Sequence, residues 1–189
     1  MKIARSRQWL SLFAALWLFI AVPARANAQW EGPPTDLAEL LWRQGYALHM
    51  FGAYEQAIVL FKRSIEARPT AEGYTFLGWS LSYIGQLQEA VAACKKAIEI
   101  DPDFGNPYND IGVYLMELDR PDEAIRWLEQ AIQAKRYCCY QFPHFNLGRI
   151  QLKRGEFAAA KRSFERALKF DPDYTPAKKA LEEIEKNWL

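Results

Sequence analysis

Hydrophobic residues recur at helical spacing along most of this chain, in runs separated by short polar turns. Side chains spaced in this way share one face of an α-helix and can pack against a neighbouring element. From residue 38 onward the runs come in pairs, and a tight turn joins the two members of each pair. These turns are Gly52-Ala53, Gly85-Gln86, Asp119-Arg120 and Gly155-Glu156. The pattern therefore predicts a succession of four helical hairpins.

A three-residue pattern repeats in each predicted hairpin. A glycine is followed by an alanine twelve residues later and by a larger residue four positions beyond the alanine, and the glycines are 33, 34 and 36 residues apart. The copies are Gly45-Ala57-Phe61, Gly78-Ala90-Cys94, Gly112-Ala124-Leu128 and Gly148-Ala160-Phe164. Small residues at the first two positions let two helices approach closely, and the larger residue fills the space beside them. A period of this length predicts a stack of repeating units.

Proline marks several predicted helix ends. Asp101-Pro102 and Asp171-Pro172 end the second helix of their copies, because proline disfavours helical geometry in the preceding residue and has no amide hydrogen. Thr175-Pro176 has the cap and first-turn pattern of one further helix, which runs towards Leu189. The charged residues expected on the exposed side of that helix are Lys178, Lys179, Glu182, Glu183, Glu185 and Lys186.

These features resemble the tetratricopeptide repeat, a unit of about 34 residues with an early glycine, a later alanine and aromatic residue, and a final proline. On this resemblance the units span residues 38–70, 71–104, 105–140 and 141–174, with a short segment at 29–37 before them and a capping helix at 175–189 after them. The resemblance implies an all-α fold, a right-handed solenoid of four helical hairpins plus a C-terminal capping helix. It also implies a non-enzymatic scaffold that binds a protein or peptide.

The third copy departs from the family pattern. It has Arg136 where the other copies have proline, and it carries two extra residues. The insertion falls in the stretch RYCCYQFP, which predicts a longer connection from Arg136 to Pro143, called the elbow below. The family's tryptophan position is also altered, and the residues found there are Leu41, Thr75, Tyr108 and His144.

The resemblance places the first helix of each unit on a concave face that can bind a ligand. The predicted groove residues are Trp42, Tyr46, His49, Met50, Trp79, Tyr83, Asn109, Val113, Met116, Phe142, Phe145 and Arg149. Exposed aromatic and apolar side chains usually mark an interaction site, so these residues predict a groove for an apolar or aromatic peptide, a helix or a partner's surface. Two alternatives remain open: some of the rings pack against the neighbouring repeat, or residues 29–37 or the last helix occupy the groove.

The first 28 residues have the pattern of a secretory signal peptide. A basic start precedes an apolar stretch of fourteen residues from Trp9 to Val22, and a small-residue site ends at Ala28. This stretch is shorter than the roughly 20 residues that a helix needs to span a bilayer. We expect cleavage after Ala28, or else after Ala26, and export to the periplasm or the medium. The alternative is an uncleaved anchor, so membrane association is expected only through such a leader or through a partner.

The net charge gives no indication of nucleic-acid binding. The four basic residues before Gln29 take the net charge from −3, for the chain without them, to +1. A mildly acidic mature chain lacks the electrostatic attraction for phosphates on which nucleic-acid binding depends. We therefore expect a protein or peptide partner and no nucleic acid.

Candidate catalytic residues are few. The two histidines, His49 and His144, lie in different copies and lack the spacing of a zinc-protease motif. No glycine-rich phosphate loop or GxSxG motif is present. We expect no enzymatic activity, no cofactor and no metal, with His49 on the groove or the surface and His144 packed at the family's tryptophan position.

The cysteines provide the most unusual chemistry. Cys138 and Cys139 are adjacent, so they can close a disulfide or bind a soft metal. The alternative is that one thiol is buried and its neighbour is exposed or bonded to a partner. Together with Cys94 they make an odd number, which leaves at least one thiol free or joined to another chain. A thiol redox or metal-handling protein is therefore the alternative function.

One stretch suggests a narrower role. The segment from Pro107 to Phe164, with NDIGVYL and FNLGRIQLKRGEF, is similar to repeat proteins that help type IV pilus secretins assemble. Those proteins are typically lipid-anchored, whereas the leader here has no cysteine. The leading expectation is a periplasmic or secreted scaffold whose aromatic concave groove binds a protein or peptide, with envelope or pilus assembly as the narrower hypothesis.

Overall fold

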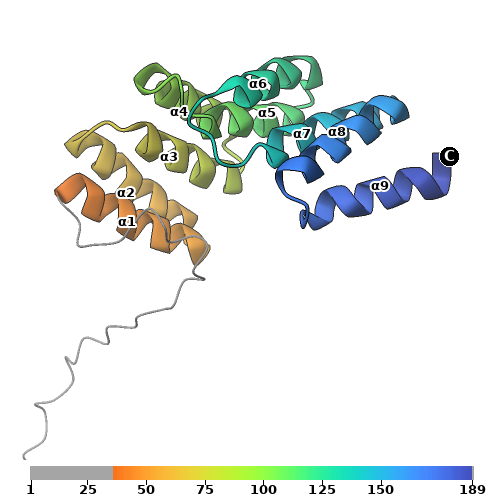
Figure 1. Ribbon diagram of the computed structural model, residues 1–189. Helices are drawn as coiled ribbons and strands as arrows, with labels where there is room; N and C mark the ends of the chain where they lie inside the picture. Colours follow the sequence, from red (N-terminus) through yellow and green to blue (C-terminus); the bar gives the residue numbers. More distant parts are fainter. Residues whose placement is uncertain (1–35, 189) are drawn as a thin grey trace, which may run out of the picture. The chain divides into compact units, whose positions relative to one another are not determined.

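The structure is a computed structural model that describes residues 36–188. The expected signal peptide at 1–28, and residues 29–35 of the segment after it, lie outside the described residues. Nine α-helices make up the described part of the chain: α1 (Leu37–Met50), α2 (Tyr54–Ala67), α3 (Ala71–Tyr83), α4 (Leu87–Ile100), α5 (Asn106–Glu117), α6 (Pro121–Gln133), α7 (Gln141–Lys153), α8 (Phe157–Phe170) and α9 (Thr175–Trp188). The first eight form four hairpins, which confirms the predicted all-α repeat fold (Figure 1).

All four predicted turns reverse the chain through a residue with left-handed backbone geometry. Gly52 and Gly85 both have φ +79°, Gly155 has φ +74°, and Asp119 has φ +56°. Glycine adopts this conformation without a steric penalty, whereas aspartate is one of the few other residues that tolerate it. The turn residues therefore fix where each first helix ends.

The repeated small and large residues hold the two helices of each hairpin together. Phe61, Cys94, Leu128 and Phe164 are all fully buried. A Cβ atom added to Gly148 would lie 2.5 Å from the ring of Phe164, so only glycine leaves room for that ring. The same contact between glycine and the larger residue occurs in the other three hairpins. The predicted spacing is thus the internal packing of each hairpin.

Successive hairpins pack through both of their helices, and their first helices lie next to one another. Helix α1 contacts α3, α3 contacts α5, and α5 contacts α7. The second helix of each hairpin packs against the first helix of the next one. The four first helices therefore form a continuous row, and this row carries all the predicted groove residues. No helix within residues 36–188 combines the length and the apolar composition that crossing a membrane requires.

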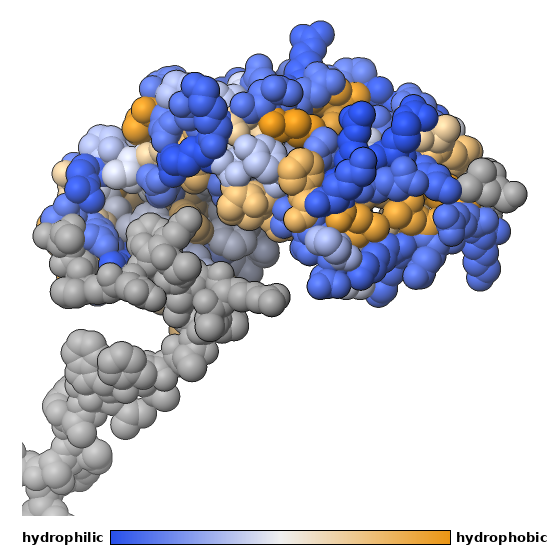
Figure 2. Space-filling view, viewed as in Figure 1, coloured by the Kyte–Doolittle hydropathy of each residue, from blue (hydrophilic) through white to orange (hydrophobic). Residues whose placement is uncertain are grey.

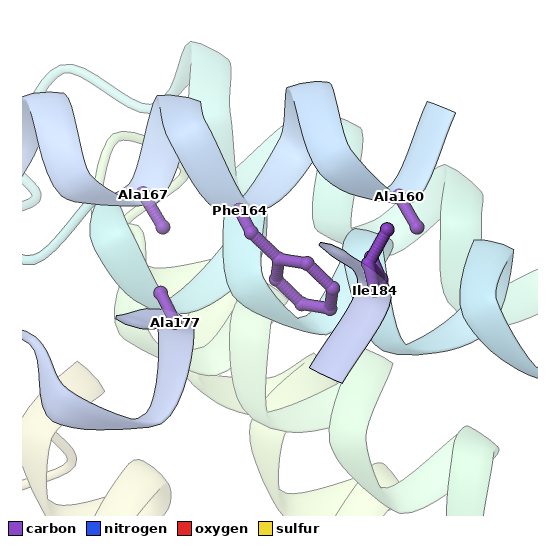
Figure 3. Packing of buried hydrophobic residues seen from close by; sticks show 5 residues of the cluster. All are labelled: Ala160, Phe164, Ala167, Ala177 and Ile184. Atoms are coloured by element: carbon purple, nitrogen blue, oxygen red, sulfur yellow. The ribbon is translucent and has the colours of Figure 1, made fainter. Parts of the chain in front are cut away.

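The last helix closes the stack. Ala177 and Ile184 of α9 pack on Ala160, Phe164 and Ala167 of α8, and all five side chains are buried (Figure 3). The six lysines and glutamates predicted to face outward are all exposed. Helix α9 thus covers the apolar face of α8 and presents a charged surface, as expected of a capping helix.

The elbow is shorter than predicted. Helix α6 ends at Gln133 and α7 begins at Gln141, so the elbow as observed comprises residues 134–140. The expectation that it extends to Pro143 is wrong, because Pro143 is buried within the first turn of α7. A proline is tolerated there since the first amides of a helix have no partner inside the helix.

Arg136 anchors the start of the elbow to the connection between α4 and α5. Its backbone amide donates to the carbonyl oxygen of Asp103 over 2.8 Å, and its carbonyl oxygen accepts from Gly105 N over 3.0 Å. Its guanidinium donates to Asp101 from Nε over 2.9 Å and to Glu72 from Nη1 over 3.0 Å. The arginine that replaces the repeat's proline therefore ties the elbow to the second hairpin and to the connection between the second and third hairpins.

Candidate binding groove

The predicted groove is filled by its own side chains at the first two hairpins. Trp42 is only 5% exposed. Its ring stacks on Tyr46 with 5.5 Å between centroids, and the edge of Phe76 from α3 meets it at 4.9 Å. The expectation that Trp42 lies open in the groove is therefore wrong. Its ring packs between adjacent repeats, which was the alternative.

His49 is also a core residue rather than a groove or surface residue. It is 4% exposed, and its Nδ1 lies 2.9 Å from Ser80 Oγ in α3. The ring of Trp79 lies against it with 4.1 Å between centroids. Burial lowers the pKa of His49 to about 4, so the ring is neutral at physiological pH. His144, by contrast, is buried and stacked on Phe170 at 5.4 Å, as predicted for a packing residue.

Some predicted residues of the first two hairpins remain exposed at the ends of their helices. Met50 is 56% exposed and Tyr83 is 54% exposed. Tyr83 stacks on Tyr54 with 4.5 Å between centroids, and Trp79 and Tyr46 are half-buried. Tyr46, Trp79 and Tyr83 thus form the edge of an aromatic cluster rather than an open groove.

An open cavity lies instead between α5 and α7, in the third and fourth hairpins. It has a volume of about 500 Å³. The residues that line it are Val113, Met116, Glu117, Asp119, Pro121, Arg149, Ile150, Lys153 and Arg154. Three of these, Val113, Met116 and Arg149, were predicted groove residues. Val113 and Met116 provide an apolar surface beside the buried Ile150, and charged groups surround it.

A chain of polar side chains runs from the cavity into the stack. Arg149 Nη1 donates to Asn146 Oδ1 over 3.2 Å, and Asn146 Nδ2 donates to Asn109 Oδ1 over 3.1 Å. Asn109 Nδ2 in turn donates to Asp110 Oδ1 over 3.3 Å. Burial raises the pKa of Asp110 to about 7, because the charged carboxylate is poorly solvated there. Asn109 and Asn146 are buried, whereas Arg149 is exposed. The hydrogen-bonded asparagines therefore orient the Arg149 side chain from the buried side of the cavity wall.

Two other cations at the cavity are already paired. Lys153 Nζ lies 3.0 Å from Asp119 Oδ1, and Arg154 Nη2 lies 2.6 Å from Asp122 Oδ1. Within the described part of the chain, Arg149 forms no ion pair with a carboxylate. A guanidinium has five N–H donors, so Arg149 can offer several to a ligand. It is the cation at this cavity best suited to a carbonyl or carboxylate oxygen.

The aromatic residues at the start of α7 are partly covered. Phe142 and Phe145 both meet the ring of Tyr174, at 5.6 and 5.2 Å between centroids. Phe145 also packs against Phe164, at 5.5 Å. Tyr174 belongs to the turn before α9, so the segment leading into the capping helix shields these rings. The structure therefore separates them from the cavity at the other end of α7.

Sequence reasoning located part of the cavity lining and missed the rest. Lys153 and Glu117 lie on the concave face that the repeat pattern predicts, and Lys153 follows Arg149 by four positions on the same helix face. Asp119 and Pro121 come from the turn between α5 and α6, which the periodicity of the first helices does not reveal. On the face drawn in Figure 2, hydrophobic residues form separate patches among hydrophilic ones.

No metal site is evident in the described residues. No group of three His, Cys, Asp or Glu side chains between residues 36 and 188 is placed to hold a metal ion. Cys138 and Cys139 form a disulfide with each other, and Cys94 is free and buried.

Comparison with known sequences identifies the repeats. Tetratricopeptide-repeat family profiles match residues 71–104, 93–126 and 142–174. Small glutamine-rich tetratricopeptide repeat-containing protein 2 of Mycosarcoma maydis is 30% identical over 97 residues. That match covers 51% of this chain and 28% of the relative, so this chain spans little more than a quarter of the relative's length.

Solved structures share the fold. PilF of Pseudomonas aeruginosa superposes with a TM-score of 0.74 at 24% identity, over 79% of this chain and 68% of that chain. PilW, a widely conserved type IV pilus biogenesis factor, gives a TM-score of 0.73 at 21% identity, over 80% and 70%. YrrB, a repeat protein with an unusual peptide-binding site, gives 0.59 at 18% identity, over 81% and 79%. At these identities the similarity shows the same stack of helical hairpins.

Proposed function

We propose that this chain, which belongs to the tetratricopeptide-repeat family, binds an extended segment of another protein across α5 and α7. The observation that carries the proposal is the cavity between these helices, with an apolar surface beside the exposed Arg149. A concave site with few, well-placed polar groups is the usual form of a binding site. The chain acts as a scaffold in this proposal, and no catalytic step is assigned to it.

Each part of the cavity has a role in binding. Val113 and Met116, which are half-buried, would contact one apolar side chain of the ligand. Arg149, held by Asn146, would donate to backbone carbonyl oxygens of the same segment. Because Asn146 already restricts the guanidinium, less side-chain entropy is lost when the ligand binds.

The relatives support a protein partner. YrrB has a peptide-binding site, and PilW is a pilus biogenesis factor. Similarity of fold does not by itself assign a ligand, so the specific site in this chain rests on its own cavity.

The experiment uses a peptide selected from a displayed library against the full chain. Its dissociation constant is measured for the unaltered protein and for a groove variant that combines Val113→Gln with Arg149→Gln. A matched control combines Val59→Gln with Arg63→Gln, which changes an exposed valine and an exposed arginine on the outer helix α2. Thermal unfolding of all three proteins checks that folding is unaffected.

The groove variant is expected to bind at least about tenfold more weakly, since one charge-assisted hydrogen bond and one apolar contact are each worth about 1 kcal/mol or more. The control variant is expected to bind like the unaltered protein. Equal affinity of the groove variant, or ligand-induced NMR shifts confined to α2, α4 and α6, would place the binding site elsewhere.

Export is a further part of the proposal. The leader pattern at residues 1–28 supports a periplasmic or secreted location. A chain tagged at its C-terminus should appear in the periplasmic or extracellular fraction, with Gln29 as its first residue. Recovery of the tagged chain from the cytoplasm with Met1 still present would contradict this location.

Envelope or pilus assembly is the narrower proposal. The shared fold of PilF and PilW supports it, together with the stretch from Pro107 to Phe164. Deletion in the source organism should reduce the number of surface pili or the assembly of another envelope machine. A deletion strain with normal pili and an intact envelope would contradict the assembly role, whereas the proposal of a peptide-binding scaffold would be unaffected.

A further inference from the structure

The elbow between α6 and α7 carries a disulfide between adjacent residues. Cys138 and Cys139 are bonded to each other. Cys138 is exposed, whereas Cys139 is half-buried and packs against the buried cluster of Ala131, Ala134 and Tyr137. One sulfur is therefore offered to solvent while the other is sheltered.

Hydrogen bonds and ring contacts on both sides of the disulfide hold the elbow in place without either sulfur. Before the disulfide, Arg136 is bonded through its backbone and Tyr137 is buried. After it, Tyr140 Oη donates to the carbonyl oxygen of Ala134 over 2.7 Å, and the Tyr140 ring lies 5.2 Å from that of Phe170. These anchors indicate that the elbow keeps its path when the disulfide opens.

A structural role explains the disulfide poorly. Cross-links stabilise a fold mainly by restricting the unfolded chain, and the effect grows with the length of the loop that they close. A bond between neighbouring residues closes almost no loop. A metal role is also poorly supported, because no third ligand lies near the two cysteines in the described part of the chain.

We propose that Cys138–Cys139 is a thiol-exchange site that reacts with a thiol at the exposed Cys138 sulfur. The thiolate of the incoming molecule attacks Cys138 Sγ, forms a mixed disulfide and breaks the bond to Cys139. Cys139 leaves as a thiolate and takes up a proton. A second thiolate then attacks the incoming molecule's sulfur in the mixed disulfide, releasing Cys138 as a thiolate that is protonated in turn. The two thiols are oxidised to one disulfide, and the cysteine pair gains two electrons and two protons.

The third cysteine cannot interfere with this exchange. Cys94 is fully buried against Gly78, where an added Cβ would lie 2.9 Å from its sulfur. Burial also raises the pKa of its thiol, which keeps it protonated. The reaction is therefore confined to the elbow.

The test equilibrates the oxidised full chain with glutathione buffers of increasing reducing strength. Free thiols are then blocked with a maleimide under native conditions and counted by mass spectrometry, while circular dichroism follows the helices. Two thiols are expected to appear together, to disappear again with oxidised glutathione, and to leave the helical signal unchanged. Cys94 should be labelled only after denaturation.

Two single variants assign the attacked sulfur. With Cys139→Ser, Cys138 should form a mixed disulfide with oxidised glutathione about tenfold faster than Cys139 does in the matched Cys138→Ser variant, because access limits the half-buried thiol. Three results would overturn the proposal: a pair that resists reduction in the folded protein, a pair that never re-oxidises, or loss of the helices on reduction. Equal rates in the two variants would equally overturn the assignment of Cys138.

Discussion

His49 in α1 and Ser80 in α3 are hydrogen-bonded across the boundary between the first two hairpins, with 2.9 Å between Nδ1 and Oγ. Both side chains are buried, and aromatic rings of Tyr54, Trp79 and Tyr83 surround the imidazole. The resemblance to the repeat family predicted that His49 lies in the groove or on the surface. Its contacts make it part of the joint between repeats.

The hydrogen bond predicts an asymmetric response to mutation. Ser80→Ala leaves the buried imidazole nitrogen without its partner, which should lower the free energy of unfolding by about 1–3 kcal/mol. Combining His49→Phe with Ser80→Ala removes both polar groups and should cost less than Ser80→Ala alone. Urea titration measures both values. A double variant less stable than the single one would show that the imidazole contributes packing rather than a hydrogen bond.

His49 should also make the fold sensitive to acid. Its pKa is lowered from 6.5 to about 4 in the folded state, so between these values the unfolded chain binds the proton that the folded chain excludes. The free energy of unfolding should therefore fall as the pH decreases from 6.5 towards 4. His49→Phe should show a smaller fall over that window, as measured by urea titration at a series of pH values. An identical slope in the variant would contradict burial of the ring.

Asp110 should act in the opposite direction. Its pKa is raised from 3.8 to about 7 in the folded state, so the folded chain binds the proton that the unfolded chain releases. Stability from this group falls as the pH rises through that window and is lost above it. Asp110→Asn should therefore be more stable than the unaltered protein at about pH 8, with the difference shrinking towards pH 4. A constant difference across this range would show that the carboxyl group is well solvated.

The buried and exposed aromatic residues predicted for the groove should differ in their contribution to stability. Trp42→Ala should cost about 3–5 kcal/mol, because the ring fills the space between the first two hairpins. Tyr83→Ala should cost about 1 kcal/mol, since more than half of the side chain is exposed and mainly ring contacts are lost. Thermal unfolding compares the two variants. Similar costs would mean that the Trp42 ring is not packed as described.

The glycine and leucine of the third hairpin should be coupled. A Cβ added to Gly112 would lie 2.6 Å from Cγ and from Cδ2 of Leu128, so Gly112→Ala should cost about 1–3 kcal/mol through overpacking. Leu128→Ala alone should cost about 2–5 kcal/mol through the cavity that it leaves. Since the added methyl group partly fills that cavity, the double variant should cost less than the sum of the two. Strict additivity in denaturant titrations would exclude direct contact.

The fold could be predicted from the sequence because its determinants are local. Gly45 and Phe61 lie sixteen residues apart within one hairpin, and their counterparts recur at the same separation. Turns at Gly52 and Asp119 depend on backbone geometry that these residue types favour. Because the same short-range residue pattern recurs in every hairpin, the sequence was sufficient to predict the helices and their pairing.

The binding site could be predicted only in part because it depends on contacts between hairpins. Helical spacing places Trp42 and Val113 on equivalent faces of α1 and α5. Phe76 of α3 covers Trp42. Its position beside Trp42 depends on how α3 is rotated about its own axis. The cavity that contains Val113 also depends on the turn before α6, and Arg149 is oriented by Asn146. The hydrophobic periodicity of a single helix contains no information about these contacts between helices.

Helix α9 limits how molecules of this protein can join. In a stack of similar hairpins, the last hairpin leaves one apolar face exposed unless something covers it. The first hairpin of another molecule could pack on that face, and repeated packing of this kind would form a fibre. Here Ile184 and Ala177 cover that face. The exposed lysines and glutamates of α9 would have to be desolvated before another molecule could pack there. At this end of the row, the apolar face of the last hairpin is therefore covered by the chain's own capping helix.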